Sequence, residues 1–196
     1  HDTTTGISFS NSNLIGIIGN NIIWGATGIK LFKSDNTLIT LNNISYQSVV
    51  GVDVDASNNV NILFNTLTAV ENGIDVFGSS GLNVVGNSIT GASDTGIHIT
   101  AAAGANILGN TITHFIKGIH VEFSDNVNIG LNVIHDTTDA IRLNYAGSNN
   151  VFLNIIYDTF NGINMINSDL AHIQYNVIAA SNNGVQGVNS SAMNLH

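Results

Sequence analysis

A repeat of 22 or 23 residues runs along this chain and constrains its fold more than any other feature. Each repeat begins with a Gly that is followed by Ile or Val. This Gly column comprises Gly6, Gly28, Gly51, Gly73, Gly96, Gly118, Gly162 and Gly184, with Ala140 in the remaining place. Repeats of this length are single supersecondary units that bury their apolar faces by stacking on one another, so the sequence predicts a solenoid.

Aliphatic residues lie at fixed distances from the Gly of each repeat. The first and third positions after it enclose an outward position, as in Ile97-His98-Ile99, and this alternation indicates a short strand with one buried face. Further aliphatic residues recur eleven and sixteen positions after the Gly, for example Ile107 and Ile112. We therefore predict three short strands in each turn.

Asn occupies the fourteenth position after the Gly in every complete repeat. The column is Asn20, Asn42, Asn65, Asn87, Asn110, Asn132, Asn154 and Asn176. Such residues would stack turn upon turn, with their amides bonded to backbone groups at a bend that water does not reach. The sequence therefore predicts an asparagine ladder in which all eight side chains are buried.

Three strands in each turn, with aliphatic and Asn columns at fixed places, resemble the right-handed parallel β-helix of the pectate-lyase-like superfamily. The resemblance covers the whole chain. It implies an all-β fold and a single parallel β-helix domain over residues 1–196, with about eight turns of 22–23 residues.

The start of the sequence repeats a segment from its middle. Residues 1–7 parallel residues 135–141, so the chain begins in mid-turn and without a capping segment. An uncapped solenoid has open strand edges that are able to pair with other strands. We expect either a portion of a longer chain or end-to-end self-association through the uncapped ends.

Charge and composition exclude several functions. With 4 Lys+Arg against 13 Asp+Glu, the chain lacks the basic stripe that nucleic acid or anionic lipid requires. No apolar run approaches the roughly 18 residues of a membrane span. The absence of Cys excludes thiolate metal sites and Cys nucleophiles. Because 31 Asn residues, rather than charged ones, keep the surface polar, we expect an extracellular or cell-surface location.

Titratable side chains gather in one column although only 9% of the residues are charged. The column lies two residues after the Gly and reads Ser8, Lys30, Asp53, Asp75, His98, His120, Arg142, Asn164 and Gln186. Asp55, Glu122 and Asn144 stand two positions further on, and Tyr145 follows Asn144. Stacking would place these residues on one surface, about 4.8 Å apart from turn to turn, which we call the charged face. The alternative is an ordinary solvated surface.

The charged face contains groups suited to the chemistry of sugar acids. Carboxylates one turn apart form an oxygen-rich cradle for Ca²⁺, for which the candidates are Asp53, Asp55 and Asp75. The candidate catalytic residues are His98 and His120, which titrate near neutral pH, and Arg142, which is suited to holding a carboxylate. The candidate substrate-binding residues are Lys117, Glu122, Asn144 and Tyr145. These groups suit proton abstraction beside a carboxylate, which leads to β-elimination or C5 epimerisation.

One turn is similar to a motif of the alginate C5-epimerases, in which Gly, an apolar residue, Asp, Pro and His follow in order. Here the turn is Gly51-Val52-Asp53-Val54-Asp55, so Asp53 falls on the Asp, while Val54 and Asp55 replace the Pro and His. The resemblance implies a polyuronate lyase or C5-epimerase that acts on an acidic polysaccharide. The alternative is a non-catalytic structural or carbohydrate-binding rod of an adhesin, phage fibre or surface protein.

Overall fold

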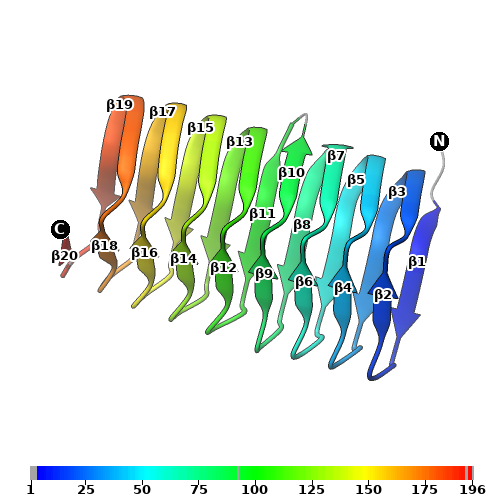
Figure 1. The fold of residues 1–196 in the computed structure, drawn as a ribbon. Helices are drawn as coiled ribbons and strands as arrows, with labels where there is room; N and C mark the ends of the chain where they lie inside the picture. Colours follow the sequence, from blue (N-terminus) through cyan, green and yellow to red (C-terminus); the bar gives the residue numbers. More distant parts are fainter. Residues whose placement is uncertain (1–3, 92, 193, 196) are drawn as a thin grey trace.

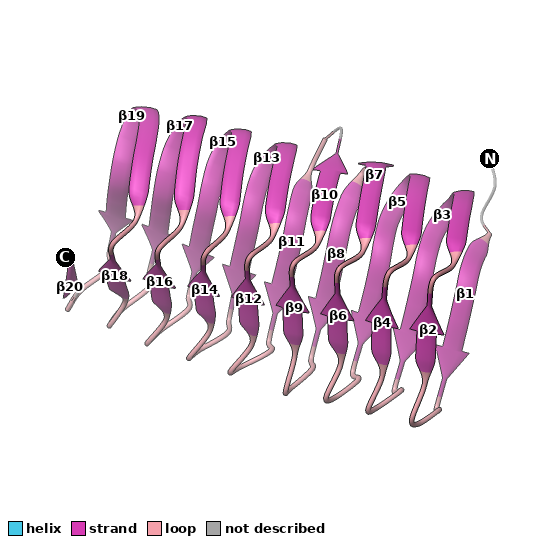
Figure 2. Cartoon of the chain, viewed as in Figure 1, coloured by secondary structure: helices cyan, strands magenta, loops and turns pink. Residues whose placement is uncertain are grey.

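The computed structural model describes residues 4–91, 93–192 and 194–195, so the first three residues of the repeated 1–7 segment lie outside the described residues. Every regular element in the described part is a strand, and every strand pairs in parallel with its neighbours, so the predicted parallel β-helix is confirmed. Figure 1 shows the turns stacked side by side along a rod, and Figure 2 shows that only loops connect the strands.

The strands form two sheets. The larger sheet contains β1 (Thr5–Ser10), β3 (Asn21–Phe32), β5 (Asn43–Asp55), β7 (Thr66–Val70), β8 (Asn72–Phe77), β10 (Ser88–Gly91), β11 (Thr95–Thr100), β13 (Thr111–Glu122), β15 (Val133–Asn144), β17 (Ile155–Ile166) and β19 (Val177–Val188). The smaller sheet contains β2 (Gly16–Ile18), β4 (Leu38–Thr40), β6 (Asn61–Leu63), β9 (Asn83–Val85), β12 (Asn106–Leu108), β14 (Asn128–Gly130), β16 (Asn150–Phe152), β18 (His172–Gln174) and β20 (Asn194–Leu195).

Two details of the predicted turn were wrong. In most turns the strand after the ladder Asn and the strand after the Gly are one continuous strand, such as the 12-residue β13. A single residue in the left-handed conformation, here His114 with φ of 63°, bends this strand while parallel pairing continues on both sides. Most turns therefore contain two strands instead of the predicted three, one in each sheet. The smaller sheet has nine strands, so the described chain makes about nine turns instead of eight.

The asparagine ladder is confirmed in its hydrogen bonds at all eight positions, and the predicted burial holds for six of them. The Asn110 Oδ1 accepts hydrogen bonds from the backbone N and the Nδ2 of Asn87, at 2.9 and 3.0 Å. The Asn110 Nδ2 in turn donates to the Val84 carbonyl at 2.9 Å and to Asn132 Oδ1 at 3.0 Å. Six ladder residues are buried, whereas Asn20 and Asn176 are half-buried because each has a ladder neighbour on one side only.

Close approach between turns explains the Gly column. A Cβ atom added to Gly118 would lie 2.5 Å from the carbonyl oxygen of Ala140 and 2.6 Å from the Cγ2 of Ile134. Added to Gly73, it would lie 2.2 Å from the carbonyl oxygen of Gly96. These distances are far below normal contact, so a larger residue would force neighbouring turns to shift.

The predicted aliphatic columns fill the interior of the rod. In the turn that starts at Gly96, the buried side chains are Ile97, Ile99, Ile107 and Ile112, and each has no exposed surface. Because successive side chains in a strand point to opposite sides, the residue between Ile97 and Ile99 must face outward. The same alternation in neighbouring turns positions the charged face on the outer surface of the larger sheet.

We expect Asn110→Ala to lower the free energy of unfolding by about 3–5 kcal/mol, measured by urea denaturation. The substitution leaves the amide groups of Asn87 and the Val84 carbonyl without their buried partner, and each unpaired buried group costs about 1–3 kcal/mol. The matched control is Asn106→Ala, which removes a half-buried Asn from the same turn and should cost less than about 1 kcal/mol. Equal losses for the two variants would contradict a special role for the ladder.

Candidate functional site

The charged face is continuous across six neighbouring turns. Parallel pairing aligns each residue with the next in the order Lys30, Asp53, Asp75, His98, His120 and Arg142. These residues come from β3, β5, β8, β11, β13 and β15. The three residues predicted to be catalytic are therefore brought together in successive turns.

His98 lies between a carboxylate and a second imidazole. Its Nδ1 is 3.0 Å from Asp75 Oδ1, and its ring stacks on that of His120 with 4.9 Å between the ring centroids. On its other edge, Nε2 is 3.0 Å from Thr100 Oγ1 and 4.0 Å from Glu122 Oε2. This arrangement orients the imidazole of His98, because Asp75 contacts one ring nitrogen and Thr100 contacts the other.

His120 is the buried histidine of the charged face, with only 8% of its surface exposed. Burial, followed by the positive groups of His98, Lys117 and Arg142, lowers the pKa of His120 to about 4. The ring is therefore neutral at physiological pH. In agreement with this, the Nδ2 of Asn144 donates to His120 Nε2 at 3.2 Å, which requires an unprotonated nitrogen.

Arg142 is contacted from two directions. Its Nε donates to Asn144 Oδ1 at 3.3 Å, and its Nη1 donates to Asp139 Oδ2 at 3.5 Å. The side chain of Arg142 is 29% exposed, whereas that of Asp139 is 9% exposed. The guanidinium is thus accessible from solvent while its acidic partner is buried beneath it.

The residues predicted to bind substrate are divided between two positions. Glu122 and Asn144 lie beside the histidines, as described above, and the Lys117 Nζ is 3.2 Å from Asp94 Oδ1. Tyr145 lies instead at the corner that borders the charged face, where it stacks on Phe123 with 5.2 Å between the ring centroids. The sequence analysis grouped these side chains by their positions in the repeat. In the structure Tyr145 lies at the edge of that group.

The structure does not support the predicted Ca²⁺ cradle. Asp53 pairs with Lys30, whose pKa is raised chiefly by that hydrogen bond, and Asp75 lies against His98. Asp55 aligns with Phe32 and Phe77 in the turns on either side. No group of three or more His, Cys, Asp or Glu in the described residues is arranged to hold a metal ion. Because each of the three carboxylates has different neighbours, they are not collected around one point.

Two acidic residues of this region were missed by the sequence analysis. Asp139 and Asp94 contact Arg142 and Lys117, but neither belongs to the columns that were selected. Asp139 belongs to the column immediately before the Gly, and it stands three residues before Arg142. Examination of that column would have found it, because Asp139 is the acidic member between Lys117 and Asn161.

Two protein families match the chain over more than half of its length. The family described as a right-handed β-helix region matches residues 1–112. The family described as periplasmic copper-binding protein (NosD) matches residues 67–196. No curated protein matches the chain.

Solved structures of alginate epimerases share the fold. The periplasmic alginate epimerase AlgG is 15% identical with a TM-score of 0.57, over 98% of this chain and 47% of AlgG. The A-module of the mannuronan C-5 epimerase AlgE4 from Azotobacter vinelandii is 12% identical with a TM-score of 0.65, over 97% of this chain and 73% of the module. The chain thus spans about half the length of AlgG, and identities this low establish a common fold only.

The copper named in one family description does not fit the side chains of the charged face. The Nδ1 of His98 is occupied by Asp75, and the stacked rings of His98 and His120 do not point toward a common centre. As noted for calcium, the described residues form no group of three or more metal-ligating side chains.

No helix in the described part of the chain is long and apolar enough to cross a membrane.

We expect His120 to make the fold less stable as the pH falls from about 6.5 to about 4. In this window the unfolded chain binds a proton at the imidazole that the native state does not bind, so stability rises with pH. The loss is on the order of 2–3 kcal/mol by pH 4. Urea denaturation at pH 7 and pH 4 should show a smaller pH dependence for His120→Gln than for the wild type. The same pH dependence in both proteins would contradict this role.

Proposed function

The chain belongs to the right-handed β-helix and NosD families, and we propose that its charged face binds an acidic polysaccharide and acts on it as a polyuronate lyase or C5-epimerase. Both reactions begin with removal of the proton at C5, beside the carboxylate of the uronic acid. The observation that carries the proposal is the ordered series Asp75, His98, His120 and Arg142 across four successive turns. The fold that this chain shares with the alginate epimerases supports the same proposal.

His98 is the candidate general base. Its Nδ1 faces Asp75 at 3.0 Å, an arrangement that favours the tautomer with the lone pair on Nε2 and stabilises the positive ring formed on proton uptake. In this tautomer Nε2 accepts from the Thr100 hydroxyl at 3.0 Å, so that hydroxyl must turn away before Nε2 takes a proton from the sugar. Asp75 therefore changes role from the predicted metal ligand to the orienting carboxylate. His120 stays neutral beside it, so the stacked ring does not repel the proton that His98 takes up.

Arg142 is the candidate group for the sugar carboxylate. A guanidinium pairs with a carboxylate through two parallel N–H donors, and the withdrawal of charge makes the neighbouring C5–H bond easier to deprotonate. Arg142 lies two turns from His98, a separation of about 10 Å, with His120 in the turn between them. A uronate unit bound over His120 would lie between the two groups.

The proposed function also implies a location for the protein. The matched NosD family and the structural neighbour AlgG are both described as periplasmic, and a polysaccharide substrate lies outside the cytoplasm. We infer that the protein acts outside the cytoplasm, either in a periplasm or beyond the cell.

A non-catalytic polysaccharide-binding rod is the second candidate, and one observation favours it. The turn that resembles the epimerase motif has Val54 and Asp55 in place of Pro and His, and Asp53 is paired with Lys30. The acid and base of that motif are therefore not reproduced in this turn. Under this alternative the same Arg142 and His98 would bind uronate units without chemistry.

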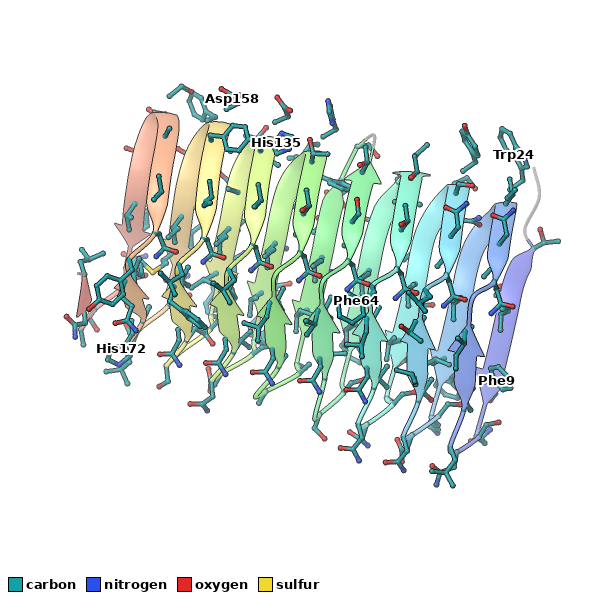
Figure 3. The ribbon with its side chains drawn as sticks, in the orientation of Figure 1. Phe9, Trp24, Phe64, His135, Asp158 and His172 are labelled. Atoms are coloured by element: carbon teal, nitrogen blue, oxygen red, sulfur yellow. The ribbon has the colours of Figure 1, made fainter. Side chains whose placement is uncertain are left out.

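We expect His98→Gln to lower turnover of polymannuronate by about 10²–10⁴-fold, because general base catalysis contributes on this scale. Absorbance of unsaturated products measures the lyase reaction, and proton NMR of the sugars measures epimerisation. The matched control is His172→Gln, an exposed histidine of β18 on the smaller sheet, whose position is shown in Figure 3. This control should retain full activity.

Calorimetry separates the two candidates. An enzyme should show turnover, and Arg142→Met should weaken oligosaccharide binding by about 10–100-fold through loss of a charged hydrogen-bond pair. Binding without turnover, lost in the Arg142 variant, would favour the rod. If the wild type neither binds nor converts polyuronates, the charged face is ordinary solvated surface and the proposal fails.

A further inference from the structure

Asp139 is a buried carboxylate beside the charged face that the proposed chemistry does not use. It lies in β15, three residues before Arg142, and is 7% exposed. Burial of an ionised carboxylate is costly unless its charge is balanced and both of its oxygens accept hydrogen bonds. The surroundings of Asp139 therefore indicate what this residue does.

Three donors surround the carboxylate of Asp139. Its Oδ1 accepts from Asn161 Nδ2 at 2.8 Å, while its Oδ2 accepts from Asn164 Nδ2 at 3.4 Å and from Arg142 Nη1 at 3.5 Å. Because all three neighbours donate, only a group that accepts at both oxygens satisfies the site. An ionised Asp meets this requirement, and an Asn of the same shape would direct its own N–H₂ group at other donors.

The same contacts restrict Arg142. Nη1 is held by Asp139 on one side, and Nε is held by Asn144 on the other. Asn144 is itself fixed, because its Nδ2 donates to the buried His120. In the part of the chain that the structure describes, no protein group accepts a hydrogen bond from Nη2, so this edge of the guanidinium is available to a ligand.

We propose that Asp139 is the positioning residue of Arg142, holding the guanidinium in one orientation so that its open edge receives a sugar carboxylate. The identity of the ligand rests on the proposed function, whereas the positioning itself does not. An unrestrained arginine loses side-chain freedom when it binds, and a preorganised one has already lost it on folding. Asp139 thus increases affinity without contacting the sugar.

Side-chain NMR tests the positioning without any sugar. Arg142 is the single arginine of the sequence, so its Nε–H group gives one signal that needs no further assignment. In the wild type this signal should show the ¹⁵N relaxation of a rigid group. Asp139→Asn should make it mobile on the nanosecond timescale, whereas the control Asp158→Asn should not. Asp158 is an exposed residue at the corner labelled in Figure 3, so the control removes the same charge elsewhere.

Calorimetry with a mannuronate oligosaccharide tests the consequence. Asp139→Asn should weaken binding about tenfold relative to Asp158→Asn, in line with the side-chain entropy of one arginine. Arg142→Lys keeps the charge but lacks the fork that Asp139 holds, and it should weaken binding to a similar extent while the melting temperature stays near that of the wild type.

The outcomes separate the two proposals. A mobile Arg142 in the wild type, or a rigid one in Asp139→Asn, overturns the positioning role. Unchanged or tighter binding by Asp139→Asn also overturns it. If Asp139→Asn does not fold, the wild-type signal and the Arg142→Lys affinity still decide the question. A wild type that is rigid at Arg142 but binds no oligosaccharide leaves the positioning role supported and refutes the proposed function instead.

Discussion

The hydrogen bonds between buried asparagine amides are the interaction on which the rest of this structure depends. The bend that leads into the larger sheet in each turn carries the ladder Asn, whose backbone N–H group is buried and is not paired with another strand. The amide of the next turn supplies that partner, as Asn110 does for the backbone N–H of Asn87. Because one buried amide bonds to the next, a slip of one residue would break the whole column. The ladder therefore fixes the register of every turn against its neighbours.

Fixed register is what makes the charged face possible in a chain with so few charges. Each outward residue aligns with its equivalent one turn away, so single substitutions in different repeats become neighbours in space. His98 stacks on His120 and contacts Asp75 although these residues are more than twenty positions apart in the sequence. The repeat supplies the scaffold, and the exceptions to the repeat supply the chemistry.

Most of the fold could be predicted from the sequence because periodic residues report on periodic environments. The Gly column corresponds to close contact between turns, the aliphatic columns to the core, and the Asn column to the ladder. The sequence could not predict that the strand after the ladder Asn and the strand after the Gly form one continuous strand. This depends on a left-handed backbone at residues such as Trp24 and His114, and these residue types do not indicate that conformation. Columns likewise predicted which charged residues are neighbours but not how they pair. Asp53 stands beside both Lys30 and Asp75. It pairs with Lys30, because the lysine side chain is long enough to reach the next turn and carries the opposite charge.

The stacked histidines impose a limit on the chemistry of the charged face. Two imidazolium rings at a centroid distance of 4.9 Å would repel each other in a partly buried site. Burial, then His98, Lys117 and Arg142, lower the pKa of His120 to about 4, so this ring stays neutral. His98 differs in its surroundings, because the carboxylate of Asp75 lies 3.0 Å from its Nδ1. Asymmetry in the surroundings thus gives two identical side chains different roles. In any reaction on this face, His98 would exchange the proton, while His120 would support the ring of His98 and accept the hydrogen bond that anchors Asn144 and, through it, Arg142.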